Sequence, residues 1–229
     1  MCGRFAFYSP SEATAALFNV ESNVVVEPRY NIAPTQFIAA IRRDSENNNE
    51  LTMFRWGLVP SWAKDPSIGN RMINARAETI AEKPSFRAAY RKRRCLIFAD
   101  GFYEWHTEND VKVPYFISLA SGSPFVFAGL WEHWQSKETE EKLQTTTIIT
   151  TEANDFLSQL HHRMPIVLEP ANAGRWLDGD MNLLDEVSAN PPDFQAWPVD
   201  RAVSNARNEA PDLIIPAGEP IQVLPLLSG

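Results

Sequence analysis

The chain has 229 residues, 44% of them hydrophobic and 11% aromatic, which fits one large domain or two small ones with a sizeable core. A net charge of −8 argues against a protein that coats nucleic acid nonspecifically. No apolar run approaches the roughly 18 residues of a membrane helix, and the amino terminus lacks the apolar segment of a signal peptide. We therefore expect a cytoplasmic protein that does not enter a membrane.

The first part of the chain predicts a helix, a hairpin and a long loop. Ser9-Pro10-Ser11-Glu12 is typical of a helix start, with Ser9 as the N-cap, so we expect a helix to about residue 18. Phe37–Arg43 and Leu51–Trp56 predict two strands joined by an Asn-rich loop. Residues 57–83 show little apolar periodicity, and long ordered loops in compact domains are usually functional.

The remainder of the chain predicts more strands than helices. Pro84–Arg94 indicates a short basic helix, whose last four residues fit either a solvated face or a local basic groove. Segments rich in Phe, Ile, Val and Thr predict strands at Cys95–Asp100, Pro114–Leu119, Phe125–Trp131, Thr145–Thr150 and Phe194–Val199. Helices are expected over Glu152–Gln159 (capped by Thr151), Pro170–Leu177 and Asn182–Ala189.

These elements predict the fold class. Strands outnumber helices and do not alternate with them regularly, which favours an α+β fold. We expect a single domain over residues 1–215, built around a curved, barrel-like, mainly antiparallel β-sheet with flanking helices. The Pro- and Gly-rich residues 216–229 are expected to form a loosely held tail.

The two cysteines do not form a disulfide framework. Cys95 opens an apolar run, so we expect it to be a buried strand residue. The four His residues and two Cys residues are scattered, without a CxxC or HExxH pair. We therefore expect neither a metal site nor a cofactor.

Cys2 is the residue with the most distinctive chemistry. Removal of Met1 would leave a 1,2-aminothiol, whose α-amine has an ordinary pKa of about 7.7–8.0 and is partly neutral at physiological pH. With an aldehyde, the amine forms an imine and the thiolate then closes a thiazolidine ring. Alternatively, the thiol attacks an amide or ester, as in amino-terminal nucleophile hydrolases. The presence of Cys2 alone is compatible with either reaction, and also with a Cys2 that has no chemical function.

Other candidate residues lie near and far along the chain. Gly3 and Arg4 beside the aminothiol suit an anionic carbonyl substrate. Glu104 stands between two aromatic residues, which could raise its pKa for acid–base work, or it is a surface residue in a hairpin turn. His161 and His162 include a possible proton shuttle, or are packed or solvated residues.

Several blocks, taken together and in order, resemble the signature of the SRAP family, named for SOS-response-associated peptidase. The six blocks are Met1-Cys2-Gly3-Arg4, Tyr30–Thr35, Trp56–Trp62, Asn74–Thr79, Phe98–Trp105 and His161–Pro165, and the match ends in Val203–Asn208. That family includes the abasic-site-processing proteins of bacteria and animals. The resemblance extends from residue 2 to about 215, and six ordered blocks anchored by a Cys at position 2 are highly specific.

The resemblance implies a set of catalytic residues. Cys2 matches the residue that crosslinks to the open-chain aldehyde of an abasic deoxyribose in single-stranded DNA. Asn74 matches the Asn that holds the Cys2 amine and the sugar. Glu104 matches the carboxylate that assists proton transfer, and His161 the histidine of imine formation and reversal. His162 occupies a more variable position.

The resemblance also implies DNA contacts. Arg4, Arg76 and Arg163 are expected to contact phosphates, which positions DNA without reading its sequence. Pro34 and Trp62 are expected to cover or wedge the bases beside the lesion, with core packing as the alternative for both.

As its partner we expect single-stranded DNA that contains abasic sites, bound by a monomer that joins the nucleoid at damaged DNA. Lyase-like strand cleavage and self-removal of amino-terminal residues are further family activities. Two alternatives remain at this point. One is a Cys/His/Glu thiol peptidase, and the other is a noncatalytic single-stranded DNA-binding module.

Overall fold

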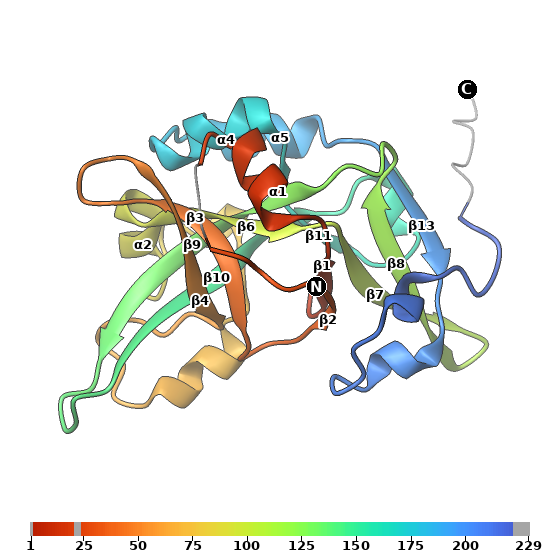
Figure 1. Ribbon diagram of the computed structural model, residues 1–229, viewed down its shortest axis with the longest axis horizontal. Helices are drawn as coiled ribbons and strands as arrows, with labels where there is room; N and C mark the ends of the chain where they lie inside the picture. Colours follow the sequence, from red (N-terminus) through yellow and green to blue (C-terminus); the bar gives the residue numbers. More distant parts are fainter. Residues whose placement is uncertain (1, 21–23, 222–229) are drawn as a thin grey trace.

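Two β-sheets form the body of the protein (Figure 1). The computed structural model describes residues 2–20 and 24–221. The first sheet is antiparallel, in the order β13-β8-β7-β1-β2. Its strands are β1 (Phe5–Phe7), β2 (Arg29–Ile32), β7 (Gly101–Glu108), β8 (Val111–Leu119) and β13 (Phe194–Pro198).

The second sheet closes on itself. Its strands are β3 (Phe37–Arg43), β4 (Asn49–Trp56), β5 (Asn74–Arg76), β6 (Arg94–Ala99), β9 (Phe125–Gln135), β10 (Lys142–Glu152), β11 (Arg163–Pro165) and β12 (Val167–Leu168). The path β10-β4-β3-β6-β9 returns to β10, because β9 and β10 also pair. Only β4 and β5 run parallel to β10. The predicted α+β fold around a barrel-like, mainly antiparallel sheet is thus confirmed.

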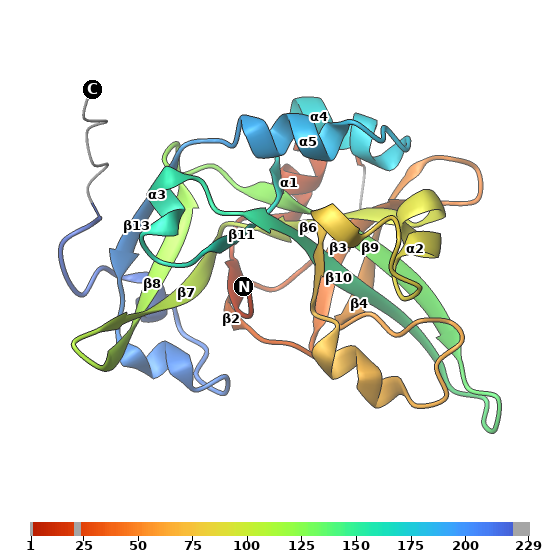
Figure 2. The same cartoon turned by 180° about the vertical axis from the view of Figure 1, so that it is seen from behind.

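Short helices surround the sheets. They are α1 (Ser11–Leu17), α2 (Arg87–Lys92), α3 (Asp155–Ser158), α4 (Pro170–Leu177) and α5 (Leu183–Ala189). The 3-10 helices are η1 (Pro66–Arg71), η2 (Ala77–Thr79), η3 (Arg201–Ser204) and η4 (Pro211–Ile214). Figures 1 and 2 show α1, α4 and α5 on the same side of the sheets, and η1 and η3 on opposite sides of β1 and β2.

Strand β1 is buried where the two sheets meet. The ring of Phe5 lies edge-on to Trp56 of β4 at 5.2 Å and to Phe127 of β9 at 5.6 Å. Phe102 of β7 contacts Phe127 in the same manner at 6.1 Å. Edge-to-face aromatic pairs add to the free energy gained by burying apolar area. These rings therefore hold the first residues of the chain rigidly between the sheets.

The structure corrects several local predictions. Ser9 does not cap α1, because its hydroxyl donates to Asp100 Oδ1 at 2.6 Å and Pro10 is the N-cap. Thr151 lies within β10, and Asn154 caps α3 instead by accepting from the N–H of Leu157 at 2.8 Å. The strands β1, β2 and β7 are not among the predicted elements.

The basic run at 91–94 does not form one surface. Arg94 is buried between the rings of Tyr90 and Trp176, with its guanidinium carbon 4.7 and 4.3 Å from the ring centroids. Arg93 pairs with Glu132 at 2.6 Å. The run is therefore divided between the core and the surface, and it matches neither a basic groove nor a fully solvated helix face.

The chain beyond residue 215 continues along β13. Pro216 pairs with Val199 in an isolated β-bridge, and the N–H of Ala217 donates to Pro198 O at 2.8 Å. The N–H of Ile221 donates to Ala196 O at 2.9 Å. The other residues of the predicted loose tail, 222–229, lie outside the described residues.

Gly57 and Gly69 make a close backbone contact that holds the loop after β4 against the barrel. A Cβ atom on Gly57 would lie 2.5 Å from Gly69 O, and the φ of Gly57 is +122°. We predict that Gly57→Ala destabilises the protein by about 1–3 kcal/mol or more, since strain and steric overlap act together. The measurement is the free energy of urea-induced unfolding.

Gly174 provides the matched control. It lies inside α4, and nothing within 4 Å would meet an added Cβ. Gly174→Ala should stabilise the protein by about 0.5–1 kcal/mol, because alanine is the better helix former. A Gly57→Ala protein as stable as the Gly174→Ala protein would contradict this account.

Candidate functional site

Asn74 lies directly beside Cys2. Strand β5 pairs with β10, with Asn74 opposite Ile148, and this pairing brings the long loop back to the start of the chain. Asn74 Nδ2 donates a hydrogen bond to Cys2 O at 2.8 Å. Asn74 Oδ1 is also buried and has no hydrogen-bond partner among residues 2–20 and 24–221. A buried, unsatisfied amide oxygen is costly, so it marks a position where a donor would bind favourably.

Cys2 is held deep in the protein. Its side chain is fully buried, and its Sγ lies 3.9 Å from Arg4 O. Desolvation, followed by the nearby charge of Glu104, raises the pKa of the Cys2 thiol well above its ordinary value. The thiol therefore stays protonated at neutral pH unless a neighbouring base accepts its proton.

Glu104 comes to Cys2 on β7. This strand pairs with β1, and the N–H of Tyr103 donates to Arg4 O at 2.9 Å. Glu104 is only 6% exposed, and its burial raises the pKa of the carboxyl group. The alternative of a surface residue in a hairpin turn is wrong, because Glu104 is buried. A carboxyl group with a raised pKa can both accept and donate a proton near neutral pH.

His161 follows α3 and has a defined ring orientation. Its Nδ1 lies 2.9 Å from the main-chain N and 3.1 Å from the carbonyl O of Arg163, so the main chain of Arg163 holds this edge of the ring. Burial lowers the pKa of His161, which favours the neutral ring. The ring of the exposed His162 stacks on it, with 4.3 Å between centroids.

Arg163 is nearly buried and bonded to its neighbours. Its guanidinium forms a bidentate pair with Glu78 at 2.7 and 3.0 Å and donates to Thr150 O at 2.7 Å. Such a fork fixes the position of the main chain that carries His161. This arrangement gives Arg163 a positioning role, while its predicted phosphate contact stays a prediction.

The other predicted DNA contacts are more accessible. Arg76 is exposed at the end of β5, and Trp62 is 55% exposed, which excludes core packing for Trp62. Pro34 is partly buried in the turn between β2 and β3. Arg4 donates through Nη1 to Asn31 Oδ1 at 2.7 Å and to Val203 O at 3.0 Å.

Asn31 is a buried residue that positions Arg4, a role that the sequence reasoning missed. It is fully buried in β2, and its side chain bonds to Arg4 and to three carbonyl groups of the segment 203–208. Asparagine is depleted in strands, so an Asn next to a strand-like Ile was an available signal for such a role.

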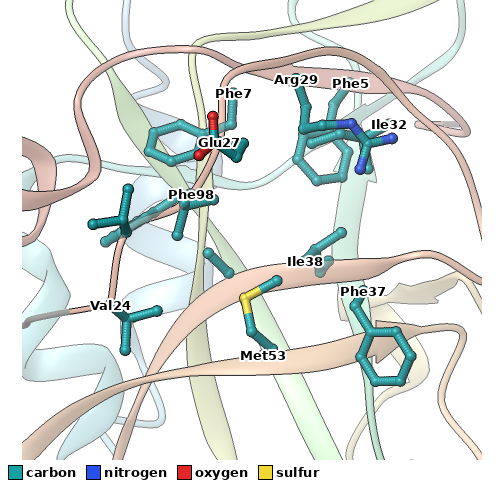
Figure 3. Close-up of a pocket in the computed structure, with 13 residues that line it drawn as sticks. Phe5, Phe7, Val24, Glu27, Arg29, Ile32, Phe37, Ile38, Met53 and Phe98 are labelled. Carbon is teal, nitrogen blue, oxygen red and sulfur yellow. The ribbon is translucent and has the colours of Figure 1, made fainter. Parts of the chain in front are cut away.

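A cavity of about 260 Å³ lies beside β1 but does not suit an anionic substrate (Figure 3). Apolar side chains of β1, β3 and β4 surround it, and Glu27 and Arg29 are the charged residues of its lining. Arg29 is already paired with Glu209 at 2.8 Å. This cavity therefore offers no guanidinium for a phosphate, and Cys2 does not line it.

Metal-binding clusters and membrane-spanning helices are both absent from the described part of the chain. It contains no group of three or more His, Cys, Asp or Glu residues arranged to hold a metal ion. It also contains no helix with the length and apolar character needed to cross a membrane.

Known proteins are similar to this chain in sequence and in fold. The family model of SOS response associated peptidase (SRAP) matches residues 1–206. The abasic site processing protein YoqW of Bacillus subtilis is 43% identical over 225 residues, covering 93% of this chain and 99% of its own. The abasic site processing protein YoaM of the same organism is 41% identical over 223 residues, covering 93% and 97%. A crystal structure of a Bacteroides thetaiotaomicron protein superimposes with a TM-score of 0.82 at 26% identity, covering 94% of this chain and 100% of the other.

The raised pKa of Glu104 makes stability depend on pH. Below about pH 4, near the ordinary glutamate pKa, both the folded and the unfolded state hold the proton and burial costs little. As the pH rises, the unfolded state releases this proton at a lower pH than the folded state does. The wild type therefore loses stability as the pH rises from the unfolded pKa of Glu104 to its higher folded pKa. We predict that Glu104→Gln melts at a higher temperature than the wild type at pH 7.

The difference in melting temperature between these two proteins should shrink as the pH falls to 4. Thermal unfolding followed by circular dichroism at both pH values measures it. A constant difference between pH 4 and pH 7 would show that the folded environment does not raise the pKa of Glu104.

Proposed function

The chain belongs to the SOS response associated peptidase (SRAP) family, and we propose that it processes abasic sites in single-stranded DNA by bonding covalently to the damaged sugar through Cys2. Its similar relatives YoqW and YoaM are named abasic site processing proteins. The observation that carries the proposal is the 2.8 Å hydrogen bond from Asn74 to Cys2 O, formed in a buried position beside Glu104. This bond supports a role for Asn74 in holding Cys2 close to Glu104.

In the first step, the amine of Cys2 attacks the sugar aldehyde. Removal of Met1 frees an amine with an ordinary pKa of about 7.7–8.0. The unsatisfied Oδ1 of Asn74 accepts an N–H of this amine and directs its lone pair toward C1′. The protonated ring of His161, made a stronger acid by its lowered pKa, donates a proton to the departing hydroxyl group of the carbinolamine, and one water leaves. The neutral ring then takes the remaining proton from the iminium nitrogen as the imine forms.

In the second step, the thiol of Cys2 closes the ring. Sγ bonds to C1′ of the imine, the C=N double bond becomes single, and the thiol proton moves to the nitrogen. Glu104 carries this proton, because its raised pKa suits both acceptance from sulfur and donation to nitrogen. The product is a thiazolidine, held by two bonds to one carbon, so it outlasts a simple imine.

The environment of Cys2 argues against the thiol peptidase alternative. A thiol peptidase needs a thiolate as its first nucleophile, and reactive cysteines lie in electropositive, partly exposed surroundings. Cys2 is instead fully buried, and the nearby charge of Glu104 raises its pKa further. The order of amine first and thiol second follows from this environment.

The DNA strand is proposed to lie across the exposed residues around Cys2. Arg76 pairs with a phosphate of the DNA, and Trp62 stacks on a base. Pro34 covers the base beside the lesion. Arg4 reaches a phosphate through Nη2, for which the described residues supply no hydrogen bond. Arg163 is paired with Glu78 and positions the main chain that carries His161, with a phosphate contact as its further predicted role.

The catalytic groups all come from one chain, so the protein is proposed to act as a monomer. It needs no cofactor for this reaction, because no electrons are transferred. The proposed place of action is the nucleoid within the cytoplasm. Strand cleavage by a lyase reaction, and removal of residues before Cys2, would be accessory reactions of the same groups.

The direct test mixes the purified protein with single-stranded DNA that carries one aldehydic abasic site and separates the products on a denaturing gel. We predict a heat-stable, slowly migrating band for the wild type and its loss in Cys2→Ala. Cys95→Ala is the matched control, because Cys95 is also fully buried but lies on β6. It should form the band like the wild type.

A protein with one residue inserted between Met1 and Cys2 tests the role of the amine. It keeps the thiol but has no free α-amine on Cys2, so it should form no band. Efficient crosslinking by the Cys2→Ala or the insertion variant would contradict the proposed function.

A further inference from the structure

The segment 203–208 has no part in the chemistry proposed above, yet the structure ties it to Arg4. Nδ2 of the buried Asn31 donates to the carbonyl oxygens of Val203, Asn205 and Asn208 at 3.2, 3.0 and 2.8 Å. Oδ1 of the same side chain accepts from Arg4 at 2.7 Å. One buried amide therefore fixes this segment close to the start of the chain.

Two further contacts attach the segment to the strands on either side of β1. Trp105 of β7 donates through Nε1 to Ser204 Oγ at 3.0 Å, and Trp105 directly follows Glu104. On β2, the N–H groups of Tyr30 and Asn31 donate to the carboxylate of Glu209, the residue directly after the segment. Because β7 and β2 are the two neighbours of β1, the segment spans the strand that leads from Cys2.

Two arginines in or just before the segment present positive charge to solvent. Arg201 and Arg207 are both exposed, and neither forms an ion pair with any described residue. The neighbouring carboxylates bond elsewhere, since Asp200 accepts from the N–H of Ala202 at 2.7 Å and Glu209 pairs with Arg29. Both guanidinium groups are therefore available to pair with an anion.

We propose that residues 201–208 form a second phosphate-binding surface, on which Arg207 and Arg201 contact the backbone of the bound DNA strand. This inference rests on the proposed function, because it takes DNA as the anion. Figures 1 and 2 place η3 and the loop after it across β1 and β2 from η1, whose loop carries Trp62. The DNA strand would then be bound on both sides of Cys2, which holds the abasic sugar next to the aminothiol.

The test measures DNA binding without crosslinking. Fluorescence anisotropy gives the Kd for single-stranded DNA whose abasic aldehyde has been reduced to an alcohol, at several NaCl concentrations. Arg207→Gln should weaken binding about two- to fivefold at low salt, as expected for an exposed charge contact. It should also lower the slope of log Kd against log salt by about 0.7, the value for one phosphate contact on a single strand. Arg207→Glu should weaken binding further.

Lys137→Gln is the matched control. Lys137 is exposed in the hairpin between β9 and β10, at the far end of the molecule from η3 (Figure 1). The Lys137→Gln variant loses the same charge as Arg207→Gln, so it reports the effect of net charge alone. It should bind DNA with the salt slope of the wild type. Circular dichroism melting checks that all variants are folded.

Each outcome decides one claim. If Arg207→Gln has the Kd and salt slope of Lys137→Gln, the proposal of a second phosphate-binding surface is wrong, even when the wild type crosslinks to abasic DNA. If Arg207→Gln alone lowers the slope, the surface is supported. A wild type that binds DNA in this way but never crosslinks would overturn the proposed function and leave the phosphate-binding surface standing.

Discussion

The burial of β1 between the two sheets is the constraint on which the site depends. Phe5 is locked edge-on against Trp56 and Phe127, so the residues before it cannot move freely. Cys2 is thereby presented to the loop, the strand and the turn that carry the other groups. A flexible amino terminus would have to lose this freedom on binding, whereas here the entropy is lost on folding, before the substrate arrives.

The same burial sets the protonation states in the site. Removal from water disfavours every charged form, so the pKa values of the Cys2 thiol and the Glu104 carboxyl rise while that of His161 falls. Three groups close to their neutral forms can exchange protons without separating charge in a poorly solvated site. Positive charge is instead supplied from the periphery by arginines, where an anionic strand would lie.

The sequence anticipated those parts of the fold that local patterns determine. Strands rich in β-branched and aromatic residues, such as Phe37–Arg43, were predicted because their composition suits a buried sheet. β1 has only three residues and is stabilised by packing from both sheets, so no local pattern marks it. The pairs of Arg163 with Glu78 and of Asn31 with Arg4 join distant segments, which single-sequence reasoning could not pair. Likewise, only the family resemblance, and no spacing, pointed to Asn74 beside Cys2.

The most direct test of the central claim is the mass of the crosslinked peptide. Digestion of the protein–DNA product with nuclease and trypsin should release Cys2-Gly3-Arg4 joined to a deoxyribose with the loss of one water. Its sulfur should not react with iodoacetamide, because the thiazolidine ring contains it. A sugar on another residue, a peptide that retains Met1, or a thiol that still reacts would contradict the account.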